Sequence, residues 1–220
     1  MKIKALIVAA IMGLLTTSAN AGPSAGVSLT GYSLNADGSE THGSAQKRSE
    51  SLEMALGSVF AEYKTDIGGF DVSLGIDHIP YDVDTETVSN FQIDSANNNR
   101  ASATITDAYK YYVMFGMGDS PVFLKLAYSE ADVLTKETIS NMQTDDSSAR
   151  TNSTYPDTKL KGTHVGLGAD IDTGMFGIAL RAEFGLSDYE EMSVTSSSGG
   201  NTIKVNADGE YANISLVKSF

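Results

Sequence analysis

The stretch that decides the fold is Phe176-Gly177-Ile178-Ala179-Leu180-Arg181-Ala182-Glu183-Phe184-Gly185-Leu186. Its even positions are apolar, whereas its odd positions include Arg181 and Glu183. Strict alternation of this kind predicts a β-strand with one apolar face and one polar face. Because successive side chains of a strand point to opposite faces, a slip of one residue would exchange the two faces completely.

The same alternation, clear in some places and weaker in others, recurs along the rest of the chain. We therefore predict eight strands near residues 25–35, 52–65, 70–77, 104–117, 122–129, 163–171, 176–186 and 207–220. In 104–117 the outward side chains would be Tyr109, Tyr111, Val113, Phe115 and Met117. In 52–65 they would be Ala55, Gly57, Val59, Ala61 and Tyr63, although the inverted assignment, with Met54, Leu56 and Phe60 outward, stays open.

The connections between these segments alternate in length. Tight turns are predicted at 66–69, 118–121 and 172–174, and long polar loops near 36–51, 80–103, 130–161 and 187–203. Short turns at one rim and long loops at the other are typical of outer-membrane barrels. In hydrocarbon every backbone N–H and C=O must pair internally, so strands can span a membrane only as a closed barrel.

We therefore predict an all-β fold, a closed eight-stranded antiparallel up-and-down transmembrane β-barrel with short periplasmic turns and long extracellular loops. In such a barrel the apolar faces contact lipid, where an arginine or lysine at mid-membrane would cost about 2–4 kcal/mol. The alternative is a soluble, secreted all-β protein in which the same apolar faces form a core.

The amino terminus has the features of a secretory leader. Lys2 and Lys4 precede the apolar run 5–15, and Ala19-Asn20-Ala21 fits a small-x-small cleavage site. We predict a signal peptide over 1–21 and one barrel domain over 22–220. The chain has no cysteine, so neither disulfides nor thiol chemistry is expected.

The formal net charge of −13 opposes binding to nucleic acid. Acidic loops could attract divalent cations, and this possibility stays open. Asp82-Val83-Asp84-Thr85-Glu86 resembles the start of a calcium loop, but the glycine and the distal glutamate of such a loop are missing. We expect no metal and no cofactor.

Charged residues on the polar faces would line the barrel interior. The predicted lumen network consists of Lys64, Asp71, Asp77, Lys110, Lys125, His164, Asp170, Arg181 and Glu183. The assumed turn lengths place Arg181 opposite Gly166, Glu183 opposite His164 and Lys64 opposite Asp71. Buried charges must pair, so these residues could form a salt-bridge plug; alternatively, they line a narrow polar pore.

Aromatic side chains are expected at the two membrane interfaces, where amphipathic rings prefer to lie. The predicted girdle comprises Tyr63, Phe70, Phe115, Phe176 and Phe220 on the periplasmic side and Tyr128, with Tyr109 and Tyr189, nearer the outer side.

These features together resemble the small eight-stranded outer-membrane barrel family, the group of the OmpA transmembrane domain, OmpX and the opacity-type proteins. The resemblance rests on Ala19-Asn20-Ala21, the alternating strands and the ending Ala212-Asn-Ile214-Ser-Leu216-Val-Lys218-Ser-Phe220. In that family the barrel-assembly machinery reads a terminal Phe preceded by apolar residues at every second position. The resemblance implies that Phe220, Leu216 and Ile214 form this assembly signal, although Lys218 departs from the pattern.

The resemblance also implies outer-membrane lipid and lipopolysaccharide as partners, in the outer membrane of a bacterium. The leading functional hypothesis is a non-enzymatic scaffold whose loops serve envelope integrity or contact with cells, phage or matrix; the extracellular partner is not identified. A small channel for ions or solutes is the alternative. A lipid-modifying enzyme is the third, because His42-Gly43-Ser44 has the His–Ser spacing of some outer-membrane hydrolases, but it lies in a predicted loop rather than on a strand.

Overall fold

The computed structural model describes residues 22–41, 46–85, 88–91, 98–117, 120–138, 155–195, 197 and 202–220. The predicted leader over 1–21 and the motif at 42–44 lie outside this part of the chain. The described residues form no helix that is long and apolar enough to cross a membrane.

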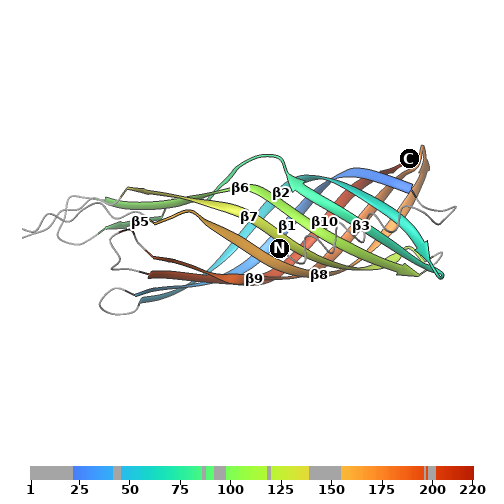
Figure 1. Cartoon of the computed structure of the whole chain (residues 1–220). Coiled ribbons are helices and arrows are strands. Elements are labelled where there is room, and N and C mark those ends of the chain that lie inside the picture. The colour runs from blue at the N-terminus through green and yellow to red at the C-terminus, as the bar shows by residue number, and fades with distance from the viewer. Residues whose placement is uncertain are drawn as a thin grey trace, which may run out of the picture.

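Eight long strands form the body of the molecule (Figure 1). They are β1 (Gly22–Thr41), β2 (Gln46–Ile67), β3 (Phe70–Ile79), β6 (Asn98–Met117), β7 (Val122–Thr138), β8 (Thr158–Met175), β9 (Ile178–Thr195) and β10 (Thr202–Ser219). Two short strands, β4 (Val83–Asp84) and β5 (Val88–Phe91), pair with β6 beyond the end of β3.

The eight long strands close into a ring. Each pairs antiparallel with the long strand before it and after it, and β1 pairs with β10 to complete the circle. β3 pairs with β2 only from Val59 onward, so closure pairs the long strands on both sides in the half of the barrel near the turns, as a hydrocarbon environment requires. The predicted closed, eight-stranded, up-and-down barrel is confirmed.

Both of the described hairpin turns lie at the end of the barrel that also carries the C terminus (Figure 1). Between β2 and β3 the turn is Gly68-Gly69, and both glycines have positive φ. Between β8 and β9 the turn is Phe176-Gly177, with φ of 52° and 68°, rather than the predicted 172–174. A bulge between Asp172 and Met175 absorbs Gly174, so β8 runs further than the glycine alone indicates.

The predicted bounds of the long loops are too wide, because the strands continue into them. Residues 36–41, 46–51, 130–138, 158–161, 187–195 and 202–203 all belong to strands. The outer face of these strand ends is largely polar, so the apolar outer stripe by which the spanning segments are recognised is missing, whereas backbone pairing simply continues from those segments.

The apolar faces lie on the outside of the ring. Phe184 is 65% exposed and Ile214 is 61% exposed, whereas Arg181 on the opposite face of β9 is only 3% exposed. On β2, Val59 is exposed and Phe60 is buried, so the outward set predicted for 52–65 is the observed one and the inverted assignment is wrong.

Candidate functional site

Large side chains inside the barrel lie over glycines of neighbouring or nearby strands. A Cβ added to Gly75 would overlap the Tyr112 ring, and one added to Gly166 would overlap the Tyr211 hydroxyl. Small and large residues therefore interdigitate across the lumen, as they do in other small barrels.

Arg181 on β9 lies at the centre of the periplasmic half of the lumen. Its Nη1 and Nη2 each donate to a Glu62 carboxylate oxygen at 2.9 Å, and its Nε donates to Asp170 at 2.7 Å. The guanidinium carbon also lies 5.7 Å from the Phe60 ring centroid and 5.3 Å from that of Phe123, close enough for cation–π attraction. Its charge is thus paired twice and enclosed by rings.

A second set of buried hydrogen bonds, around Glu183, adjoins the set around Arg181. Glu183 accepts hydrogen bonds from Lys125 Nζ at 2.9 Å and from Tyr211 Oη at 2.5 Å. Lys125 Nζ lies 4.4 Å from the Tyr112 ring centroid, and Tyr112 Oη donates to Glu62 at 2.8 Å. The two groups therefore form one network, which we call the lumen plug: Glu62, Asp170, Arg181, Tyr112, Lys125, Glu183 and Tyr211.

Three further polar side chains lie on the extracellular side of the lumen plug. Lys110 Nζ donates to Tyr32 Oη at 2.9 Å. The His164 ring lies between two hydroxyls, with Nδ1 2.8 Å from Ser187 Oγ and Nε2 2.8 Å from Ser129 Oγ. Asp77, opposite Lys110 in the β3–β6 pairing, is 8% exposed, and its Oδ1 has no hydrogen-bond partner within the described residues.

The structure brings together most of the charged residues predicted for the lumen, but in a different register. Arg181 lies opposite Asp170, not Gly166, and Glu183 lies opposite Gly168, not His164. The cause is the β8–β9 turn, which follows Met175 rather than Asp172. Lys64 lies opposite Ser73, not Asp71, but its Nζ still reaches Asp71 diagonally at 2.8 Å near the periplasmic rim.

The sequence reasoning missed Glu62, Tyr112 and Tyr211 of the lumen plug, the rings of Phe60 and Phe123 that flank Arg181, and Tyr32 beside Lys110. A signal was available for Glu62, because it shares the inward face of β2 with Phe60. The aromatic members are apolar by type, so an alternation pattern does not distinguish a ring that fills a lumen from one that contacts lipid.

Most residues of the predicted girdle lie on the barrel exterior or at its turn. Tyr189 does not: it has the inward parity of Arg181 on β9 and lines the lumen, with its ring centroid 5.6 Å from that of His164, so its assignment to the girdle is wrong. Phe70, Phe115 and Phe220 are exposed, and Tyr63 and Tyr128 are half-buried. Phe176 is 87% exposed, but it occupies the β8–β9 turn instead of beginning a strand. The interface role of these rings stays a prediction.

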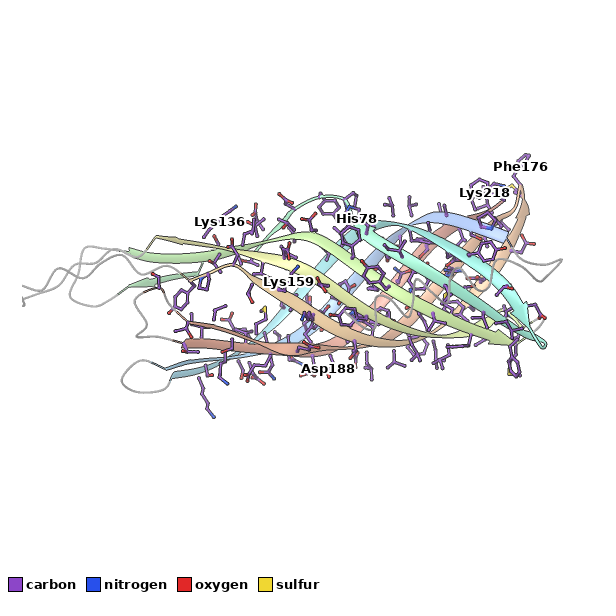
Figure 2. The ribbon with its side chains drawn as sticks, viewed as in Figure 1. His78, Lys136, Lys159, Phe176, Asp188 and Lys218 are labelled. Carbon is purple, nitrogen blue, oxygen red and sulfur yellow. The ribbon has the colours of Figure 1, made fainter. Side chains whose placement is uncertain are left out.

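The residues of the predicted assembly signal share the outer face of β10. Ile214, Leu216 and Phe220 are exposed there. Lys218, which breaks the apolar pattern, bends to the Phe176 carbonyl at the same end of the barrel (Figure 2). A long lysine stem on an apolar surface with its ammonium at a polar edge is a snorkelling arrangement. Recognition by the assembly machinery stays a prediction.

No family model matches the chain, and no curated protein matches it in sequence. Among solved structures, it is similar to Ail, the attachment invasion locus protein of Yersinia pestis, in complex with the heparin analogue sucrose octasulfate, with 10% identity and a TM-score of 0.35 over 87% of this chain and 99% of that one. It is also similar to the outer membrane protease OmpT of Escherichia coli, with 10% identity and a TM-score of 0.44 over 90% and 97%. Neisserial surface protein A matches at 11% identity and a TM-score of 0.33 over 87% and 97%.

The closed ring of eight strands with an apolar exterior decides the fold class. The fold is that of the small outer-membrane β-barrels. The resemblance predicted from the alternation is thus confirmed at the level of the fold.

The described part of this barrel holds no group of three or more His, Asp or Glu side chains that could bind a metal ion. Both ring nitrogens of His164 lie within hydrogen-bond distance of serine hydroxyls. In the predicted calcium-like segment, Asp84 accepts hydrogen bonds from Thr104 at 2.6 Å and Lys136 at 3.3 Å. These contacts hold the pKa of Asp84 below its ordinary value.

Proposed function

We propose that the protein is a non-enzymatic, plugged scaffold of the bacterial outer membrane that presents its extracellular strand ends and loops as an interaction surface. The exterior of β7 supports membrane insertion. Val122, Leu124 and Leu126 face outward in sequence, followed by Tyr128 and then by Glu130 and Asp132. An apolar band that ends at an aromatic residue and then at charges is the order expected across a membrane interface.

The outward residues beyond this band also pair with one another. Lys159 Nζ on β8 lies 3.2 Å from Glu130 and 2.5 Å from Asp132, both on β7. Outward acidic residues such as Asp188 and Glu210 lie at a similar height on β9 and β10. The strands therefore carry a ring of charged, solvent-exposed side chains above the proposed lipid surface.

The observation that carries the proposal is the lumen plug. Arg181 and Glu62 bond directly across the interior, and Phe60 and Phe123 flank the guanidinium. A channel for ions needs a continuous watery path, whereas here the periplasmic half is occupied by paired charges and rings. This arrangement supports a scaffold over the small channel.

Planar-bilayer conductance of the refolded protein tests the proposal. We expect no steady current from the wild-type barrel and a measurable current from the triple variant Phe60→Ala/Phe123→Ala/Arg181→Ala, which removes Arg181 from the lumen plug together with the two rings that flank it. A steady current through the wild-type barrel would replace the scaffold with the channel.

The loops are tested separately from the barrel. In a variant with a short turn in place of residues 139–154, heat-modifiable gel migration of the outer-membrane fraction should stay unchanged, because the ring of strands is retained. Attachment of the displaying bacteria to cells or matrix should fall. Unchanged attachment together with increased sensitivity to detergent would favour a role in envelope integrity.

A further inference from the structure

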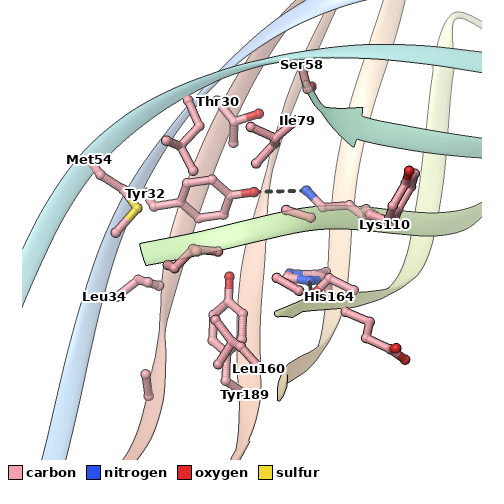
Figure 3. Close-up of a pocket in the computed structure, with 18 of the residues that line it drawn as sticks. Thr30, Tyr32, Leu34, Met54, Ser58, Ile79, Lys110, Leu160, His164 and Tyr189 are labelled. Carbon is pink, nitrogen blue, oxygen red and sulfur yellow. Dashed lines mark hydrogen bonds between the residues drawn. The ribbon is translucent and has the colours of Figure 1, made fainter. Parts of the chain in front are cut away.

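A cavity of about 190 Å³ lies in the lumen on the extracellular side of the lumen plug (Figure 3). Its wall is predominantly apolar and is contributed by several strands; the main aliphatic and thioether contributors are Leu34, Met54, Leu56, Ile79, Leu160 and Met192. A cavity of about 150 Å³ with such a lining is known to bind benzene in another protein. The space therefore suits a small apolar molecule of about one substituted ring.

Polar groups of opposite charge lie at one side of this cavity. Lys110 donates to Tyr32 Oη, as the dashed line in Figure 3 shows, and an ammonium has three donors, so it can also donate to a ligand. Asp77 also lines the cavity; it is more than nine-tenths buried, and its Oδ1 has no hydrogen-bond partner in the described part of the barrel. A buried carboxylate oxygen without a donor is costly, so a carboxylate turned toward the cavity gains from a hydrogen-bond donor on a ligand.

These two side chains restrict the head group of the ligand. A carboxylate would face Asp77 with like charge, and an ammonium would face Lys110 with like charge. A neutral hydroxyl can donate to Asp77 and accept from Lys110, so it satisfies both. An apolar body fits the wall, since Leu34, Leu56 and Ile79 offer no polar partner.

We propose that the extracellular half of the lumen is a binding site for a small, neutral, monocyclic alcohol of the alkylphenol class. The ring occupies the apolar wall, and the hydroxyl lies between Asp77 and Lys110. The lumen plug closes the path beneath the cavity, so the molecule is held and does not cross the barrel. This property goes beyond the scaffold role and does not depend on it.

Methionine-methyl NMR of the full barrel in nanodiscs tests the site with 4-ethylphenol as the probe. Met54 and Met192 line the cavity, whereas Met117 and Met175 are exposed on the exterior and report partition into lipid. We expect saturable shifts of the Met54 and Met192 signals and no saturable shift of the other two. Linear, unsaturable shifts at all four positions would show partition alone and overturn the proposal.

Four controls make the test specific. Ethylbenzene, which lacks the hydroxyl, should bind about tenfold more weakly than 4-ethylphenol, and Asp77→Asn should reduce that difference. Ala207→Phe places a ring in the cavity and should abolish the shifts, whereas Ala212→Phe, on the lipid face of the same strand, should leave them intact. Equal affinity for both probes would overturn the hydroxyl contact, and full binding by Ala207→Phe would overturn the site.

Discussion

Arg181 and Glu62 meet across the barrel through two parallel hydrogen bonds, each 2.9 Å long. They belong to β9 and β2, which β1 and β10 separate in the ring, so their contact crosses the interior rather than following a strand pair. Both side chains are buried. The lumen plug thus links opposite walls of the barrel. Each of its buried charges is stabilised only while its partners are present.

Removing one side chain of the lumen plug should therefore lower the free energy of unfolding by more than its own hydrogen bonds contribute. We predict that Glu62→Ala lowers the free energy of unfolding by about 3–5 kcal/mol, because Arg181 remains buried with less compensation. Urea unfolding of the refolded barrel measures this. Glu53→Ala, on the exposed face of the same strand, should stay within about 0.5 kcal/mol of wild type. Equal effects of the two substitutions would show that the network does not stabilise the fold.

The outer face of β9 should tolerate charge only beyond the apolar band. Ala182 is exposed between Leu180 and Phe184, so Ala182→Lys should destabilise the barrel in lipid by about 2–4 kcal/mol. Asp188→Lys, further along the same face (Figure 2), should cost at most about 1 kcal/mol. Unfolding in lipid vesicles measures both, and a tolerated lysine at 182 would contradict the assigned lipid face.

Replacing a glycine that lies beneath an aromatic ring by alanine should destabilise the barrel, because even a methyl group has no space there. Gly75→Ala is expected to cost about 1–3 kcal/mol, since its Cβ would overlap the Tyr112 ring and force repacking of the lumen plug. At Gly57 the nearest atom to an added Cβ is Tyr81 Oη at 3.6 Å, so Gly57→Ala should be close to neutral. Thermal unfolding of the two variants gives the comparison; identical midpoints would exclude close packing at Gly75.

The spanning strands could be predicted because lipid imposes a period of two on them. Arg181 and Glu183 point inward and Phe184 points outward, as their alternation requires. Strand ends above the lipid have water on their outer face, so selection for an apolar outer face ceases and the pattern disappears. The β8–β9 turn was misplaced because Gly174 has positive φ within a bulge, a role that sequence does not distinguish from a turn.

The candidate site could be predicted only in part, for a different reason. Strand parity selects the residues that face the lumen, but it carries no information on which of them meet across it. The contact of Arg181 with Glu62 depends on ring closure and on strand tilt, which are properties of all eight strands together. The unpartnered Oδ1 of Asp77 and the apolar cavity likewise emerge only from packing.

Protonation should affect one contact of the extracellular strand ends. The pKa of Asp84 lies below its ordinary value of 3.8. The largest cause is the hydrogen bond that Thr104 donates to its carboxylate, and the hydrogen bond from Lys136 is the next largest. Because the carboxyl pKa is lowered, the contact stabilises the β4–β6 pairing fully at pH values above the ordinary pKa. This stabilisation is lost as the pH falls through the lowered pKa. Carboxyl NMR titration should show this, and Thr104→Val should return the pKa toward 3.8; an unchanged pKa in that variant would exclude the hydrogen bond as its cause.

Nitroxide scanning of β10 tests the orientation of the barrel wall most directly. The chain contains no cysteine, so each cysteine introduced from Ala212 to Val217 carries a unique label. In nanodiscs, collision with oxygen, which concentrates in lipid, should peak at Ala212, Ile214 and Leu216, and should be low at Asn213 and Ser215. Oxygen maxima at Asn213 and Ser215, or strong collision of a water-soluble nickel complex at Ile214, would contradict a lipid-facing apolar exterior.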